Sequence, residues 1–218
     1  MALIHRAEIR PTKLELLEAW LPGRPWSPAG SGEARQEVRA LRKVASARFD
    51  DPAGEVGVEL MVVRAGGDGP LLHVPLTYRA APLAGAEHAL VGTMEHSVLG
   101  LRHVYDGCAD PVFVAALART VLTGGRQADE VVEGDPGPRA PDVVLAGSGR
   151  PGEPVPDLAP VRVVADGDPA VVTAGSLVVE VLRVLGPAGA RAGGEGATLH
   201  ATWAAHPEPV LLARVRTA

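Results

Sequence analysis

The chain has few aromatic residues, one cysteine, two lysines and no long hydrophobic run. Aromatic side chains make up 3% of its 218 residues, so the core has to be built from Val, Leu and Ala. Cys108 is the one cysteine, which excludes an internal disulfide and a Cys-x-x-Cys metal or redox motif. No segment approaches the ~20 consecutive apolar residues of a membrane span. We therefore expect a cytoplasmic protein that does not enter a membrane.

The charge balance argues against nucleic acid as a partner. The formal net charge is −5 at pH 7, and the basic residues are scattered along the chain. Binding to a phosphate backbone requires a positive patch, which this distribution does not provide. Apolar residues make up 46% and charged residues 22%, which is the balance of a globular protein.

Two helices are predicted in the first 132 residues. The stretch Thr12-Lys13-Leu14-Glu15 has the spacing of a capping box, and leucines at helical spacing continue from it to Trp20. Asp110-Pro111 combines a capping side chain with proline at the first helical position, so a second helix should begin there. Because Arg119 is the only charged residue of the second helix, this helix should pack against a sheet.

Strands are predicted around these helices. Residues 55–62 alternate between apolar and other side chains, and residues 72–78 continue as the antiparallel partner of a hairpin. Pro75 cannot donate a ladder hydrogen bond, so we expect it on an edge strand or at a bulge. Further strands are predicted at 2–10 and 89–94.

The rest of the chain is predicted to be β-rich. Residues 133–160 are rich in proline and glycine, which is typical of a linker or a loosely held loop. Strands follow at 161–164, 177–184, 198–203 and 210–215. Their short and medium connections favour an antiparallel sheet over βαβ units. The predicted fold class is α+β, with two helices packed on a curved antiparallel sheet.

Several sequence elements resemble the N-terminal cap domain of maltokinases. Residues Trp20–Trp26 are similar to the Trp-Leu-x-x-Gln-Arg-Trp element that opens these caps, also in trehalose synthase–maltokinase fusions. Tyr105-Asp106-Gly107, followed by Asp110-Pro111, resembles their Tyr-Asp-Ala…Asp-Pro segment. Residues 74–79 and 90–100 are similar to stand-alone cap-like proteins of actinobacteria. The resemblance covers about residues 4–130.

The resemblance implies a cystatin-like topology in which an antiparallel sheet cradles a helix. It also implies no catalysis by the cap itself, since the phosphate loop, catalytic Asp and magnesium ligands of the kinases belong to later lobes. None of these motifs is found in the 218 residues, so we expect neither kinase activity nor a bound cofactor or metal. Arg24-Pro25 stands where the kinases have Gln-Arg, so contacts of that pair cannot be transferred.

The resemblance and the strand pattern together give a division of the chain. Residues 1–132 are the cap-like region, residues 133–160 a linker or loop, and residues 161–218 a β-rich segment. This last segment has strands but no helical pattern, so it needs another surface to cover its apolar side chains. We therefore expect it to pack back on the first region as one cooperative unit.

One stretch concentrates groups that bind metals or transfer protons: Glu95, His96, Arg102, His103, Tyr105 and Asp106. No recognised metal spacing is present, however. The favoured interpretation is a polar network that pins a loop onto the sheet, with these residues as candidates for contacts with a ligand or partner.

Trp26 and Arg24 complete the set of binding candidates. Trp26 lies beyond the predicted helix end, so it is the better candidate for exposure and for stacking on a sugar ring. Trp20 lies among leucines at helical spacing and is expected to anchor the core.

Two functions follow as hypotheses. The first is a protein that docks on or regulates an enzyme of maltose-phosphate, α-glucan or trehalose metabolism. The second is a binding module for maltose or an α-glucan that uses Trp26. An exposed apolar patch or an open sheet edge would favour a protein partner, whereas a concave pocket lined by Trp26 would favour a sugar.

Overall fold

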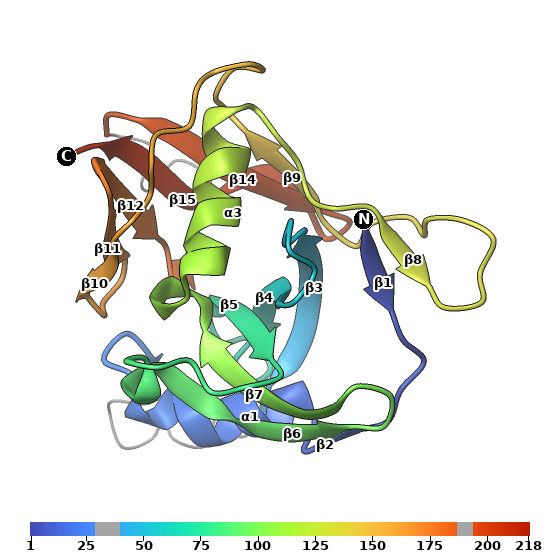
Figure 1. Cartoon of the computed structure of the whole chain (residues 1–218). Coiled ribbons are helices and arrows are strands. Elements are labelled where there is room, and N and C mark those ends of the chain that lie inside the picture. The colour runs from blue at the N-terminus through green and yellow to red at the C-terminus, as the bar shows by residue number, and fades with distance from the viewer. Residues whose placement is uncertain (29–39, 187–193) are drawn as a thin grey trace.

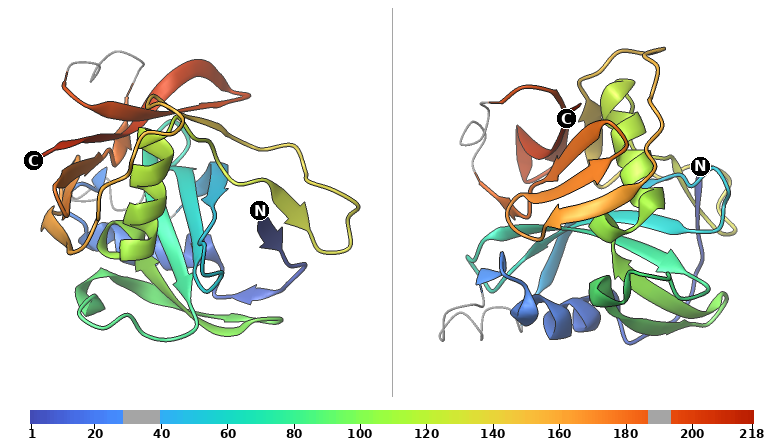
Figure 2. Two further views of the ribbon diagram at one scale, coloured as in Figure 1. Left: turned by 45° about the horizontal axis from the view of Figure 1, so that its top comes forward. Right: turned by 60° about the vertical axis from the view of Figure 1, so that its left-hand side comes forward.

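The middle layer of the molecule is a seven-stranded antiparallel sheet. The computed structural model describes residues 1–28, 40–186 and 194–218. In this sheet the strands follow the order β2-β6-β7-β5-β4-β3, and β13 also pairs with β5. Their bounds are β2 Ile9–Arg10, β3 Arg42–Phe49, β4 Gly57–Arg64, β5 Leu71–Arg79, β6 Leu90–His96, β7 Gly100–Asp106 and β13 Val184–Leu185. The sheet curls into an open half-barrel (Figures 1 and 2).

A second antiparallel sheet, of six strands, lies above the first and carries the C-terminal part of the chain (Figure 1). Its order is β10-β11-β12-β15-β14-β9. The bounds are β9 Val144–Gly147, β10 Val161–Ala165, β11 Ala170–Ala174, β12 Leu177–Val181, β14 Ala197–Trp203 and β15 His206–Thr217. A parallel pair, β1 Ala2–Ile4 with β8 Glu130–Val132, lies beside both sheets.

Helix α1, Lys13–Trp20, covers one face of the middle sheet. Thr12 caps it: its hydroxyl accepts from the Glu15 amide at 3.3 Å, and the Glu15 carboxylate accepts from the Thr12 amide at 2.6 Å. The short η1 turn, Leu21–Gly23, follows. The buried Leu17 and Trp20 pack against Met61 and other side chains of β4 to β7. The predicted capping box is therefore confirmed.

Helix α3, Pro111–Leu122, lies between the two sheets. The turn η5, Gly107–Ala109, leads into it, and a further 3-10 turn, η4 Glu87–Ala89, precedes β6. Asp110 caps α3 through its carboxylate, which accepts from the Val112 amide at 2.9 Å. The same carboxylate binds Thr77 and Arg79 of β5, at 2.7 Å each. One fully buried side chain therefore fixes the start of α3 to the middle sheet.

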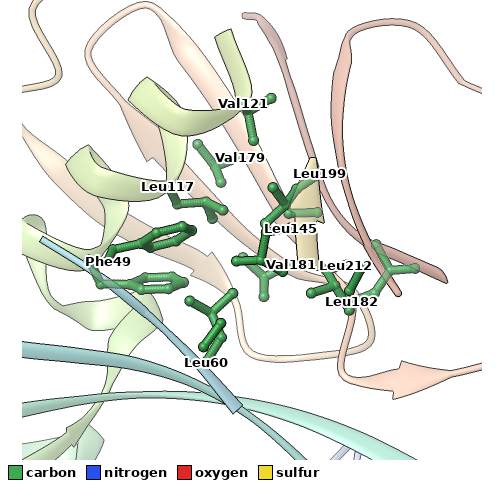
Figure 3. Close-up of a cluster of buried hydrophobic side chains, with 14 of the residues drawn as sticks. Phe49, Leu60, Leu117, Val121, Leu145, Val179, Val181, Leu182, Leu199 and Leu212 are labelled. Carbon is green, nitrogen blue, oxygen red and sulfur yellow. The ribbon is translucent and has the colours of Figure 1, made fainter. Parts of the chain in front are cut away.

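The largest core cluster fills the space between α3 and both sheets (Figure 3). Phe49 and Leu60 reach it from the middle sheet, and Leu117 reaches it from α3. Side chains from the C-terminal part of the chain complete it, among them Val179, Val181, Leu182, Leu199 and Leu212. The alternation predicted at 55–62 is present in β4, but both faces of this strand are buried because α1 covers the opposite face.

The α+β class, the antiparallel pairing and the two helices are confirmed. The strand predicted at 2–10 is wrong, because residues 2–4 pair with β8 whereas residues 9–10 pair with β6. The strand predicted at 177–184 breaks at Leu182-Arg183, and β13 then joins the middle sheet instead. The sequence pattern predicted no strand at β3, β7, β8 or β11. The cystatin-like topology implied by the resemblance stays a prediction.

Pro75 lies within an interior strand, so the expectation of an edge position is wrong. On one side β5 pairs with β4 along its length. On the other side it pairs with β13 at Leu71–Leu72 and with β7 from Leu76 to Arg79. Pro75 lies in the interval between these two partners, where no ladder hydrogen bond is lost by its lack of an amide donor.

The proline- and glycine-rich segment contains a strand that was not predicted. Residues 144–147 form β9, which pairs with β14, and Leu145 is buried in the main core cluster. At least this part of the segment is therefore held by backbone pairing and by apolar burial.

Candidate functional site

The structure divides the candidate residues between two places. Trp26, Arg24 and Asp106 belong to a largely buried network between the two sheets. The polar residues of 95–103 lie on the hairpin formed by β6 and β7, and Tyr105 belongs to neither group. Its hydroxyl, on a buried side chain, accepts from the Leu83 amide at 2.9 Å.

Trp26 is buried, with only 6% of its surface exposed, so the expectation that it is accessible is wrong. Its ring meets Trp20 edge-on, with 6.0 Å between the ring centroids. Its Nε1 donates to Asp166 Oδ1 at 3.1 Å. The guanidinium of Arg183 lies 4.8 Å from the centre of the Trp26 ring, which is cation–π geometry. The ring is therefore enclosed by side chains and offers no face to a sugar.

Arg183 is the centre of this network and was not among the predicted residues. It is fully buried and donates from Nη2 to Asp106 Oδ2. Burial alone would lower the pKa of the guanidinium, but the Asp106 carboxylate outweighs burial and raises that pKa. The Arg183 amide also donates to Asp168 Oδ1 at 2.8 Å. The Arg183 guanidinium thus remains charged inside the protein.

His73 and Arg24 extend the network on its two sides. The His73 amide donates to the Arg183 carbonyl at 2.8 Å, and its Nδ1 donates to the Leu182 carbonyl at 2.9 Å. Burial lowers the pKa of His73 to about 4, so the ring is neutral. Arg24 stacks on the Trp20 ring at 4.8 Å and approaches Asp166 to 3.6 Å.

The network joins residues from far-apart parts of the sequence. Trp26 and Asp166 are 140 positions apart, and Arg183 and Asp106 are 77 positions apart. Such contacts leave no local signal, so only the residue types Trp and Asp could be singled out from the sequence. Because its central groups are buried, the network is suited to fixing the C-terminal part on the middle sheet.

The other candidates lie on the hairpin formed by β6 and β7, on its strands rather than on a long loop. β6 and β7 pair from Leu90↔Tyr105 to His96↔Gly100. Glu95 is exposed, while His96, Arg102 and His103 are half-buried. The structure therefore spreads these four side chains along two strands, and it brings them to no common centre.

His96 holds the turn of this hairpin. Its Nδ1 accepts from the Val98 amide at 3.3 Å and from the Leu99 amide at 3.1 Å. Arg102 donates from Nη2 to the Leu99 carbonyl. The turn is also fixed to the N-terminal segment, because Ser97 and Glu8 exchange two hydrogen bonds of 3.0 Å.

The same turn carries apolar side chains that face solvent. Val98, Leu99 and Leu101 are 52%, 44% and 45% exposed. We call these three residues the apolar turn. Sequence reasoning missed them because 95–106 was judged by its charged groups, although Val98-Leu99-Gly100-Leu101 is an apolar run around a turn glycine.

Two surface hollows lie elsewhere. The larger, of about 810 Å³, is lined by Val44, Asp142, Val144, Trp203 at the end of β14, and the turn between β14 and β15. The smaller, of about 450 Å³, runs along α3 beside Phe49 and Arg119. Neither contains Trp26, and neither is lined by the β6–β7 hairpin.

Metal ligands do not gather in the part of the chain that the structure describes. Within residues 1–28, 40–186 and 194–218, no group of three or more His, Cys, Asp or Glu side chains is placed to hold an ion.

Cys108 is buried beside Arg183 and Asp106, and burial raises the pKa of its thiol. No described helix is long and apolar enough to cross a membrane.

Comparison with known families matches part of the chain to a family model. Residues 20–110 match the model of the maltokinase N-terminal cap domain. This stretch is similar to the N-terminal cap domain of maltokinases. It runs from Trp20, at the end of α1, to Asp110, the cap of α3, and so contains β3 to β7 and the apolar turn. No curated protein matches the chain.

Proposed function

We propose that this chain is a non-catalytic, cap-like protein that docks on or regulates an enzyme of maltose-phosphate, α-glucan or trehalose metabolism. The family match supports a role beside a larger enzyme, because the matching model is a maltokinase cap domain. The sequence contains no Gly-x-x-x-x-Gly-Lys phosphate loop, and its two lysines are Lys13 and Lys43.

The chain itself covers both faces of the cap-like sheet at the central strands β4 and β5. α1 packs on one face through Leu17 and Trp20. On the other face, side chains such as Phe49 and Leu60 pack against α3 and the six-stranded sheet (Figure 3). A partner therefore has to dock on another surface of this region.

The apolar turn is the observation that carries the proposal. In the described part of residues 20–110, four large apolar side chains are clearly exposed, and all belong to β6, β7 or their connection: Leu90, Val98, Leu99 and Leu101. Three of them lie together at the turn. Apolar side chains grouped at the surface are typical of sites that bind another protein. The backbone bonds to His96 and Glu8 hold them in place.

The alternative function, binding of maltose or an α-glucan, depended on an accessible Trp26. This ring is buried against Trp20, Arg183 and Asp166. A sugar could stack on it only after the network had opened, which counts against this alternative.

Affinity capture from native cells tests the proposal. The immobilised full chain should retain an enzyme that acts on maltose phosphate, α-glucan or trehalose, and Leu99→Ser/Leu101→Ser should lose it. Val164→Ser is the matched control, because Val164 is an exposed apolar residue on β10, far from the turn in sequence. Equal retention by the hairpin variant would exclude docking at the turn.

Two further measurements separate the competing functions. Calorimetric titration with maltose should show no binding, and binding without capture of an enzyme would favour the alternative. The purified chain should not form maltose 1-phosphate from ATP and maltose, because it lacks the phosphate loop and its lysine. Formation of that product would make the chain a kinase.

A further inference from the structure

The β6–β7 turn is held by a side chain whose hydrogen-bonding character changes with pH. His96 Nδ1 accepts from two backbone amides, those of Val98 and Leu99, at 3.3 Å and 3.1 Å. An imidazole nitrogen can accept only in the neutral ring, and the proton must then be on Nε2. These two bonds therefore exist only while His96 is uncharged.

We propose that His96 is a pH-sensitive latch that fixes the apolar turn in its docking conformation when neutral and releases it when protonated. In the imidazolium form Nδ1 carries a proton, so it faces two amide protons and can accept from neither. Val98 and Leu99 then lose their local partner, and both residues carry exposed apolar side chains. The link to docking rests on the function proposed above.

The groups around His96 favour the neutral, latched form. The ring of His5 lies edge-on at 5.9 Å between centroids, and Arg102 of β7 reaches the same turn. Partial burial lowers the pKa of His96, and the charges of His5, Arg102 and Lys13 add to this effect, which outweighs the opposing hydrogen bond between the ring and its own backbone. The acidic groups are placed elsewhere: Glu133 binds His5 at 3.0 Å, and the exposed Glu95 lies opposite Leu101 in the ladder.

The direction of the effect follows from this arrangement. The folded protein holds the pKa of His96 below the ordinary value of 6.5. The latch is therefore closed at pH values above 6.5, and it opens as the pH falls through the lowered pKa of His96. Below that pKa the closed form decreases about tenfold for each pH unit.

The matched variant is His96→Asn. An Asn side-chain oxygen can accept from backbone amides two and three residues further along, and it does not titrate. We expect this variant to keep the turn closed at every pH. His5→Gln is the control for the neighbouring ring, and the latch should still open in it.

Nuclear magnetic resonance tests the latch without any partner, with protons as the only ligand. In the wild-type chain the amide signals of Val98 and Leu99 should shift with the same midpoint as the His96 ring signal, below pH 6.5. In His96→Asn they should not shift. Amides that ignore the His96 titration, or that shift equally in His96→Asn, would overturn the proposal. If the variant does not fold, the comparison of the amide and ring midpoints in the wild-type chain still tests the latch.

Capture of the partner enzyme at neutral and acid pH distinguishes this proposal from the proposed function. Retention should fall at acid pH for the wild type and persist for His96→Asn. A turn that opens while the wild type retains the enzyme equally at both pH values would refute docking through this turn, and the latch itself would stand.

Discussion

At the scale of single residues, the buried charges explain why the two faces of the middle sheet stay fixed to their neighbours. Glu59 of β4 is buried under α1, where it binds Lys13 Nζ and accepts from the Tyr78 hydroxyl at 2.6 Å. Arg48 lies 3.7 Å from the same carboxylate. Burial would raise the pKa of Glu59, but Lys13 and Arg48 outweigh it and lower the pKa to about 2.

Replacing Glu59 by Gln should destabilise the protein in a pH-dependent way. At neutral pH the change leaves the half-buried Lys13 without its carboxylate, which should lower the free energy of unfolding by about 3 kcal/mol. The pKa of Glu59 is lowered in the folded state. The stabilisation by its charge is therefore complete above pH 4.5 and decreases as the pH falls towards about 2. Urea unfolding at several pH values measures this difference.

The exposed Glu95 provides the control for that substitution. Glu95→Gln should change the free energy of unfolding by less than about 0.5 kcal/mol, as surface substitutions do. A loss in Glu59→Gln that stays constant from neutral pH down to about 2 would contradict the role given to the Glu59 charge.

Arg183→Met should destabilise the network around Trp26. The change leaves Asp106 buried without its cation, which we expect to cost about 3–5 kcal/mol, and it removes the cation over the Trp26 ring. Thermal unfolding followed by tryptophan fluorescence measures both effects. Arg162→Met, at an exposed position of β10, is the control. Equal midpoints for the two variants would show that the buried pair contributes nothing.

At the scale of elements, the end of α3 depends on the segment that follows it. The amides of Gly149 and Arg150 donate to the carbonyls of Val121 and Leu122, at 2.9 Å and 3.0 Å. These carbonyls belong to the last turn of the helix, where intrahelical donors run out. The proline- and glycine-rich segment therefore completes α3 and positions β9 beside it.

Gly149→Ala should weaken this junction. A Cβ atom at position 149 would lie 1.9 Å from the Leu122 carbonyl oxygen, so the segment would have to move away from α3. We expect a loss of about 1–3 kcal/mol, as for other overpacked sites. Gly137→Ala is the matched control in the same segment, because nothing lies within 4 Å of its Cβ position. Calorimetry should give the wild-type midpoint for this control and a lower one for Gly149→Ala.

Sequence reasoning succeeded where an element is specified by neighbouring residues. The capping residues Thr12 and Asp110 marked both helices, because a cap and its helix are adjacent in the chain. β7 was missed since its charged residues hid its strand pattern, and β9 was missed since glycine and proline surround it. Trp26 was misjudged because its partners, Asp166 and Arg183, come from the other end of the sequence.

At the scale of the whole molecule, the C-terminal part of the chain and the cap-like region share contacts of every kind. β13 pairs with β5 through Val184↔Leu72 and Leu185↔Leu71. The main core cluster contains side chains from both, such as Leu60 and Leu199, and the Arg183–Asp106 ion pair joins them as well. Removing either part would expose the apolar side chains that the other part covers.

We therefore predict that residues 1–218 unfold in one cooperative transition. Leu17 and Leu199 test this, because both are fully buried but belong to different core clusters, the first under α1 and the second in the six-stranded sheet. Each change to Ala should lower the free energy of unfolding by about 2–5 kcal/mol and shift the same single transition. Calorimetry that resolved two transitions, each shifted by one variant only, would show two independent domains. A chain of residues 1–132 that unfolded at the full-length midpoint would show the same, because the strands after residue 132 would then contribute nothing to the stability of the cap-like region.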